Sequence, residues 1–141
     1  DGEKRIELQR LSEKMGLKER IILPGNADNV AELIYKARVF VLSSNTEGMP
    51  NTLIEAMLMG LTVISTDCPC GGPAELIAHG VNGLLTPVGD VKAMENALRA
   101  VLGDLRRADE MGREAAKLKE SYEAGAVYKS WENYLEKVMH R

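Results

Sequence analysis

Short aliphatic segments that alternate with helical patterns constrain the fold of this chain more than any other feature. Three such segments, rich in β-branched and aliphatic residues, lie at 20–23, 38–42 and 61–65. Turn residues and then apolar residues at helical spacing follow each of them, and residues 83–88 form a weaker fourth candidate. Strands that alternate with helices form βαβ units, so the pattern predicts an α/β fold with a parallel sheet. The near-continuous apolar run at 39–42 predicts helices on both faces of that sheet.

The first two helices are predicted from apolar spacing and from residues typical of helix ends. The apolar stripe of the first helix consists of Leu8, Leu11 and Met15. Gly16 follows this stripe and is expected to end the helix. Asp28 can cap a second, short helix at 30–36.

The second half of the chain is predicted to be mostly helical. Asp90 can open one helix, and apolar residues three and four apart continue the pattern at 105–115 and 127–138. We expect no strand after about residue 88. Trp131 and Tyr134 fall on the last stripe and are predicted to be core or packing residues rather than a platform on which bases stack.

The charge and composition of the chain exclude two classes of function. Its 18 basic and 21 acidic residues are intermixed and give a net charge of -3, so the basic patch of a nucleic-acid-binding protein is absent. The longest apolar-leaning stretch, 53–64, is too short to span a bilayer and is interrupted by Glu55 and Gly60. The first ten residues carry charges where a signal peptide needs an apolar run. These features predict a cytoplasmic location and no nucleic-acid partner.

Cys68 and Cys70 invite a disulfide or metal interpretation. A disulfide across one intervening residue would be strained, which favours reduced thiols. Besides these two cysteines the chain offers only the distant His79 and His140, whereas zinc needs four clustered ligands. We therefore expect no metal site.

Two strand-to-helix turns within residues 43–77 are the most informative part of the sequence. The first turn, EGMPN at 47–51, leads into a predicted helix at 52–59, and the second, CPCGGP at 68–73, leads into one at 74–78. Glycine allows close approach to a ligand, and proline at the first helical turn sacrifices no needed donor. Both helix starts would present free N–H groups at the carboxyl edge of the sheet, where open α/β sheets bind ligands. Two such starts at one crevice suit a diphosphate.

Glu47 and Glu55 add two acids to the first of these turns. Glu47 lies in the turn itself, within reach of a ligand over the helix start. With Asn51 as the N-cap, Glu55 lies about one turn into the helix, among apolar neighbours on every side. A carboxylate in such surroundings needs a partner. Sugar hydroxyls are suitable, because one carboxylate can accept from two adjacent O–H groups.

Each of these features also has a purely structural interpretation. The 47–51 turn could be only a turn and a helix cap. Glu55 could pair with an arginine or extend to solvent, and residues 71–73 could be a tight connection. His79 could end its helix, where a positive charge is favourable. Taken singly, none of these features requires an enzyme.

Taken together, EGMPNTLIEAMLMGLTVISTD and the following GGPAELIAHGVNGLL closely resemble the family 4 retaining glycosyltransferases. The family signature is an acid, seven residues and a second acid followed by Ala-Met, as at Glu47 and Glu55. Residues 21–25 and 81–85 extend the likeness to essentially the whole chain. The resemblance implies a two-domain GT-B architecture. Residues 1–141 would form a single Rossmann-like donor-binding domain from its C-terminal half, with the first strand and helix of that domain lying upstream.

The resemblance also implies roles for individual residues. Glu55 would bind the ribose hydroxyls of the nucleotide, and Glu47, the expected catalytic residue, would contact a hydroxyl of the transferred sugar. The helix start would face the sugar and phosphates, the loop at 24–27 would lie beside the base, and residues 68–75 would line the far side of the pocket. The other donor-binding residues expected are Gly48, Met49, Pro50, Asn51, Thr52, Gly25 and Asn26.

The implied reaction transfers a sugar from a nucleotide diphosphate sugar, expected to be UDP-linked, to a saccharide or lipid-linked saccharide with retention of configuration. It needs no cofactor and no metal, and the helix start favours electrostatic stabilisation of the diphosphate. The family binds the acceptor with an N-terminal domain and the diphosphate with an Arg and a Lys, none of which is matched here, so this fragment is expected to be inactive alone. The full-length enzyme would act in the cytoplasm, with peripheral association at the inner face of the membrane as a further expectation. Residues 67–69 are similar to members that build bacterial surface polysaccharides.

Two other functions stay open on the sequence alone. A GT-B sugar-nucleotide epimerase would need histidine and acid pairs in the cleft, for which His79 is the only nearby candidate. A non-catalytic nucleotide-binding module would keep the fold, but a module without a donor would have no use for a buried second acid at Glu55.

Overall fold

The computed structural model describes residues 2–27 and 29–139 of the chain. Contacts divide the chain into two compact units, Asp1–Glu32 and Leu33–Arg141. Helix α2 (Val30–Ile34) crosses the boundary between them. Asp28, the predicted cap of that helix, lies outside the described residues. The grouping of all 141 residues into one Rossmann-like domain stays a prediction.

The first unit contains helix α1 (Arg5–Lys14) and an irregular segment tied back to it. The guanidinium of Arg5 donates a hydrogen bond of 2.6 Å to the carbonyl of Leu23. The helix ends where expected, because Gly16 adopts a left-handed φ of 66° just past it. The apolar stripe of α1 is exposed along its whole length: Leu8, Leu11 and Met15.

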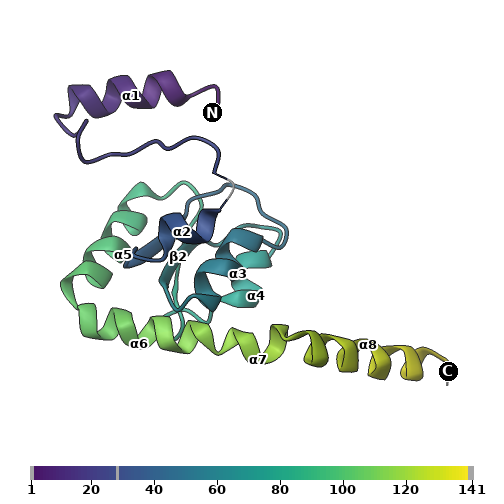
Figure 1. Cartoon of the computed structure of the whole chain (residues 1–141). Coiled ribbons are helices and arrows are strands. Elements are labelled where there is room, and N and C mark those ends of the chain that lie inside the picture. The colour runs from purple at the N-terminus through teal and green to yellow at the C-terminus, as the bar shows by residue number, and fades with distance from the viewer. Residues whose placement is uncertain (1, 28, 140–141) are drawn as a thin grey trace. The chain divides into compact units, whose positions relative to one another are not determined.

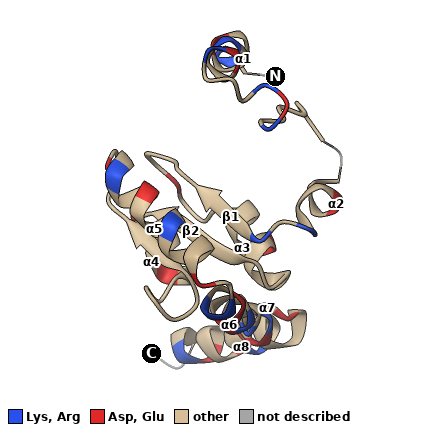
Figure 2. Ribbon diagram, turned by 90° about the vertical axis from the view of Figure 1, so that its left-hand side faces the viewer, with Lys and Arg blue, Asp and Glu red and all other residues tan. Residues whose placement is uncertain are grey.

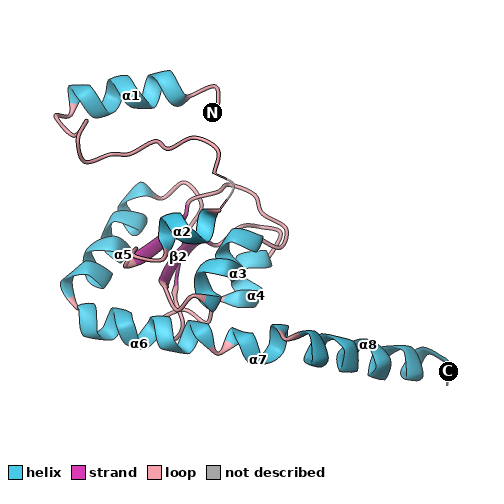
Figure 3. Cartoon of the chain, viewed as in Figure 1, coloured by secondary structure: helices cyan, strands magenta, loops and turns pink. Residues whose placement is uncertain are grey.

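The strand predicted at 20–23 is wrong. Residues 21–27 form a loop (Figure 3), and the side chain of Ile22 is 81% exposed. A strand needs a neighbour whose backbone groups pair with its own. In the described part of the chain, the strands that do pair all belong to the second unit.

The second unit is built on a three-stranded parallel sheet in the order β1-β2-β3. The strands are β1 (Val39–Leu42), β2 (Thr62–Thr66) and β3 (Leu84–Thr86). In the register of the sheet, Leu42 lies beside Ser65, and Thr66 lies beside Thr86. The other three predicted strands are therefore confirmed, to within one or two residues at their ends. No charged residue lies in these strands, whereas the helices carry many (Figure 2).

Helices cover both faces of the sheet, as predicted (Figure 1). They are α3 (Asn51–Leu58), α4 (Gly72–Leu76), α5 (Val91–Gly103) and α6 (Leu105–Ala116). Alternate residues of a strand face opposite sides, so Val63 and Ile64 belong to different cores. Val63 packs with residues of α3 and α4, whereas Ile64 packs with residues of α5 and α6. The two crossover helices thus share one face, and the carboxyl ends of all three strands point to one edge.

Helix α6 packs against the amino end of the central strand. The Thr62 hydroxyl, at the start of β2, donates a buried hydrogen bond of 2.6 Å to the carbonyl of Ala108. At Gly112 the helix lies so close to the turn before β2 that a Cβ atom would fall 2.2 Å from the carbonyl oxygen of Gly60. These contacts pack α6 closely against the amino end of β2.

The connection from α4 to β3 is held by two polar side chains. Nδ1 of His79 accepts a hydrogen bond of 3.0 Å from the Leu85 N–H. The Asn82 side chain accepts from the Ala78 N–H at 2.8 Å and donates to the Leu76 carbonyl at 3.1 Å. The prediction that His79 ends its helix is wrong, because α4 begins two residues earlier than expected and ends at Leu76.

The last two helices are α7 (Leu118–Tyr122) and α8 (Ala124–Met139). Of the two roles predicted for Trp131 and Tyr134, a place in a core is wrong for the described residues, whereas the two rings do pack on each other. They are 60% and 59% exposed and stack edge to face on each other, with ring centroids 6.1 Å apart. Both faces of the sheet are already covered by α3 to α6, so no core face of the sheet remains for α8.

Candidate functional site

Three loops meet at the carboxyl edge of the sheet. Residues 43–50 join β1 to α3, residues 67–71 join β2 to α4, and residues 87–90 join β3 to α5. In a parallel sheet this edge is where ligands bind, because helix starts and loop backbone converge there. Most of the predicted site residues lie in the first of these loops or in the helix that follows it.

The starts of α3 and α4 lie side by side, as the two similar turns predict. A Cβ atom on Gly72 would fall 1.4 Å from the carbonyl oxygen of Gly48 and 3.2 Å from Cδ of Pro50. Only glycine therefore fits at this position, and the signal for it in the sequence is the Gly-Gly-Pro run. Helix α4 has only five residues, so α3 is the substantial helix of the pair.

The start of α3 presents backbone donors to the edge of the sheet. Its hydrogen bonds begin with the Leu53 and Ile54 N–H groups, which donate to the Pro50 carbonyl at 3.1 and 3.2 Å. The N–H groups of Asn51 and Thr52 precede these bonds and have no acceptor within the helix. Both residues are exposed, as are Gly48 and Met49 in the loop before them, whereas Pro50 is buried.

The prediction that Asn51 caps α3 is wrong. Pro50 occupies the cap position with extended backbone angles, and no side chain caps the helix. Proline has a fixed φ that suits the entry to a helix, so the helix begins one residue earlier than the sequence pattern indicates. An uncapped start leaves its N–H groups available to an anionic ligand.

Glu47 is held in a defined position within the first loop. The Ser44 hydroxyl donates a hydrogen bond of 2.6 Å to Oε1 of Glu47, and both residues are half-buried. The Ser44 carbonyl accepts in turn from Oγ1 of Thr66 at 2.5 Å and from Sγ of Cys68 at 3.3 Å. The loop that carries Glu47 is thereby fixed to the end of β2. Ser44 is not among the residues predicted for the site, although it lies only three residues before Glu47 in the sequence.

Glu55 lies where the sequence predicts it along α3, but its surroundings differ. The buried face of the helix consists of Leu53, Ala56 and Met57. Glu55 is exposed, so the prediction of apolar neighbours on every side is wrong. Successive residues on a helix are turned by about 100°, and Glu55 falls outside the buried stripe. In the described part of the chain, no ion pair or hydrogen bond engages its carboxylate.

Gly25 and Asn26 belong to the first unit, in the loop after α1. Gly25 adopts a left-handed φ of 81°, and Asn26 is exposed. Their predicted place beside the base stays a prediction.

A second feature of the carboxyl edge is a pocket of about 290 Å³, which the sequence pattern does not predict. It is lined by Ser43, Asn45, Thr66, Pro87, Gly89, Asp90, Val91 and Met94. Asp90 is the cap of α5, as predicted, and accepts a 2.8 Å hydrogen bond from the Ala93 N–H. The pocket therefore lies between the first and third loops, next to the segment that carries Glu47.

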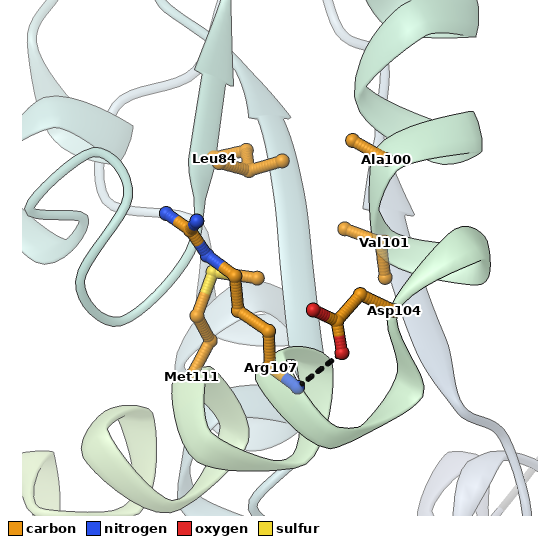
Figure 4. Close-up of a pocket in the computed structure, with 6 residues that line it drawn as sticks. All are labelled: Leu84, Ala100, Val101, Asp104, Arg107 and Met111. Atoms are coloured by element: carbon orange, nitrogen blue, oxygen red, sulfur yellow. Dashed lines mark hydrogen bonds between the residues drawn. The ribbon is translucent and has the colours of Figure 1, made fainter.

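Another pocket of similar size lies away from these residues, between β3, α5 and α6 (Figure 4). Its lining combines Leu84, Val101 and Met111 with two charged residues, Asp104 and Arg107. The Asp104 carboxylate accepts a hydrogen bond of 3.0 Å from the backbone N–H of Arg107, so it serves as the cap of α6. None of the predicted site residues lines this pocket, and we do not assign the function to it.

Clusters of metal ligands and membrane-spanning helices are absent from the described residues. Nowhere in ranges 2–27 and 29–139 do three His, Cys, Asp or Glu side chains cluster as metal ligands would. None of the helices within these ranges is both long enough and apolar enough to cross a membrane.

Comparison with known proteins identifies the family of the chain. A model of the family described as Glycosyl transferases group 1 matches residues 1–104. The chain belongs to the group 1 glycosyl transferases. One relative is the Vi polysaccharide biosynthesis protein VipC/TviE of Salmonella typhi, 40% identical over 99 residues, which are 70% of this chain and 17% of that protein. Another is the lipopolysaccharide core biosynthesis glycosyltransferase LpsE of Rhizobium meliloti, 32% identical over 104 residues, or 74% of this chain and 30% of LpsE.

Solved glycosyltransferase structures show the same fold. The crystal structure of Anabaena Alr3699/HepE in complex with UDP superposes with a TM-score of 0.84 at 23% identity, over 94% of this chain and 36% of HepE. The parallel sheet and its helices thus correspond to the C-terminal Rossmann-like half of a GT-B glycosyltransferase, as the resemblance implied. The chain spans less than two-fifths of the length of each of these three proteins.

Proposed function

We propose that this group 1 glycosyl transferase chain binds a nucleotide diphosphate sugar, with UDP as the nucleotide, at the carboxyl edge of β1 and β2. The observation that carries the proposal is the start of α3. Uncapped N–H groups at Asn51 and Thr52 lie between a positioned acid, Glu47, and an exposed acid without a partner among the described residues, Glu55. Donors for phosphate oxygens and acceptors for hydroxyls are the groups that a nucleotide sugar requires.

Glu55 is assigned to the ribose. Its carboxylate is exposed and free of protein partners in the described chain, so it can accept hydrogen bonds from two adjacent hydroxyls. Because Glu55 is exposed, a ligand over the start of α3 can reach its carboxylate directly. The UDP named in the matched HepE structure supports the choice of nucleotide.

The diphosphate and the sugar are assigned to the loop and the helix start. The N–H groups of Gly48, Met49, Asn51 and Thr52 face the negative charge that develops on the leaving diphosphate, and the positive end of the α3 dipole adds to their effect. Glu47 accepts from a hydroxyl of the transferred sugar. In this arrangement neither acid serves as a proton donor to the leaving group, and the amides stabilise its charge directly.

The complete reaction is proposed to be transfer of the sugar, with retention of configuration, to a saccharide or lipid-linked saccharide acceptor. Relatives named for polysaccharide and lipopolysaccharide biosynthesis support this class of acceptor. The acceptor and further contacts to the diphosphate would come from the rest of the full-length protein, in the cytoplasm or at the inner face of the membrane. No observation favours an epimerase, because His79 lies in the connection that leads into the amino end of β3, whereas the proposed site lies at the carboxyl ends of the strands.

Sugar transfer by the full-length protein tests the proposal. UDP-glucose, UDP-galactose and UDP-N-acetylglucosamine would be offered with lipid-linked saccharide acceptors, and UDP release and the anomeric configuration of the product would be measured. Glu55→Ala is expected to lower kcat/KM by about tenfold or more, because hydrogen bonds to a charged group contribute about 1.5–3 kcal/mol. Glu132→Ala, an exposed acid of α8, is the matched control. If the Glu55→Ala variant transferred sugar as fast as the wild type, the assignment of Glu55 to the ribose would be wrong. If the anomeric configuration of the product were inverted, the proposed retention would be wrong.

A further inference from the structure

We infer that Ser44 is a positioning residue for Glu47, and that the end of β2 fixes Ser44 in turn. The inference rests on the proposed function, in which Glu47 accepts from a hydroxyl of the donor sugar. It gives Ser44, Thr66 and Cys68 a part in the site that they exert through Glu47.

The first link joins the Ser44 side chain to the acid. The hydroxyl donates to Oε1 of Glu47 at 2.6 Å, a length typical of a hydrogen bond to a charged oxygen. A glutamate side chain that is free on a loop samples several rotamers. The hydrogen bond restricts Glu47 to the rotamers in which Oε1 accepts from the Ser44 hydroxyl. Oε2 and the remaining lone pairs of Oε1 stay available to accept from a ligand.

The second link joins the Ser44 backbone to the sheet. Its carbonyl accepts from Oγ1 of Thr66 and from Sγ of Cys68, which are 4% and 2% exposed. Thr66 is the last residue of β2, which pairs with strands on both sides, so it is among the most firmly held positions of the unit. Cys68 begins the neighbouring loop and also contacts Thr66, with 3.5 Å between Sγ and Oγ1.

The two links together connect Glu47 to the core of the sheet through one residue. A carboxylate held in place before the ligand arrives recognises a hydroxyl without the loss of rotamer freedom that a mobile one would suffer. The nucleotide itself does not depend on Glu47. Loss of the Ser44 hydroxyl should therefore weaken binding of the nucleotide sugar while leaving binding of the nucleotide alone unchanged.

The test is calorimetric titration of the full-length protein with UDP and with whichever of UDP-glucose, UDP-galactose and UDP-N-acetylglucosamine the wild type binds most tightly. The variants are Ser44→Ala, Ser44→Thr, Glu47→Gln and the double variant Ser44→Ala/Glu47→Gln. Ser121→Ala, an exposed serine of α7, is the matched control. Thr66→Val removes one of the two hydrogen bonds to the Ser44 carbonyl, and so tests the position of the same loop through a second residue.

We expect Ser44→Ala to weaken binding of the nucleotide sugar by about three- to tenfold, with UDP binding changed less than about twofold and the melting temperature maintained. Ser44→Thr keeps a hydroxyl and should restore binding, and Thr66→Val should show a smaller loss in the same direction. The double variant should bind as Glu47→Gln does, because the two residues act as one unit.

Three results would overturn the inference. If Ser44→Ala binds the sugar nucleotide normally while Glu47→Gln does not, Glu47 acts without Ser44 and the proposed function survives. If Ser44→Ala weakens binding of UDP and binding of the sugar nucleotide equally, or also lowers the melting temperature, Ser44 has a general structural role. If Glu47→Gln binds normally, or the wild type binds none of the ligands, the proposed function itself fails.

Discussion

The backbone of Gly72 at the start of α4 touches the backbone of Gly48, with room for no side chain between them. This contact sets the start of α3 and the start of α4 beside each other at the carboxyl edge of the sheet. The shape of the proposed donor site therefore requires glycine at position 72, because a Cβ atom there would overlap the carbonyl oxygen of Gly48.

Gly72→Ala is expected to destabilise the protein by about 1–3 kcal/mol and to weaken binding of UDP, since the added methyl group must displace the loop at 48–50. Thermal unfolding and calorimetry of the same samples would measure both effects. Gly103→Ala is the matched control, because it lies in α5 with open space around the new Cβ. Normal stability and UDP binding in Gly72→Ala would show that the two turns are not in close contact.

Asn82 is expected to contribute to the stability of the unit through its two hydrogen bonds, one to the Leu76 carbonyl at the end of α4 and one from the Ala78 N–H. Asn82→Ala should cost about 1–2 kcal/mol in the free energy of unfolding, as the loss of a helix cap does. Urea denaturation would measure the change. Asn96→Ala, at an exposed position of α5, should be neutral or slightly stabilising. Equal effects of the two substitutions would contradict this role of Asn82.

Glu95 on α5 is expected to titrate at unusually low pH. The hydrogen bond from Lys92, and then the bond from Arg99, hold the pKa of its carboxyl below the ordinary glutamate value. A carboxyl whose pKa is lowered on folding adds stability above its unfolded-state pKa and loses it as the pH falls through the folded-state pKa. Replacing Lys92 and Arg99 by Met should move the pKa of Glu95 upward in an NMR titration. No movement would show that these two bonds do not persist in solution.

Much of this fold could be predicted from the sequence because it follows from local pattern. Three of the four aliphatic segments became strands, and Asp90 and Gly16 mark helix ends where their residue types indicate. The segment at 20–23 has the same composition but is a loop, since strand formation depends on a partner that composition does not reveal. Burial of Trp131 failed as a prediction for a related reason: periodicity shows that a face is apolar but not what covers it.

The site could be predicted in position but not in detail. The signature of two acids correctly placed Glu47 in a loop and Glu55 one turn into a helix at the carboxyl edge. The pattern did not reveal that Pro50 would take the cap position or that Glu55 would face solvent, because both depend on how α3 rotates onto the sheet. The role of Ser44 depends on hydrogen bonds to Thr66 and Cys68, residues more than twenty positions away.

The central claim, that the start of α3 with Glu55 is the nucleotide site, is tested most directly by calorimetric titration of the full-length protein with UDP. We predict that Glu55→Ala weakens UDP binding by about 10- to 100-fold, the loss of hydrogen bonds to one charged group, whereas Glu47→Gln leaves it within about twofold. If the Glu55→Ala variant bound UDP as tightly as the wild type, the proposed nucleotide site would be wrong.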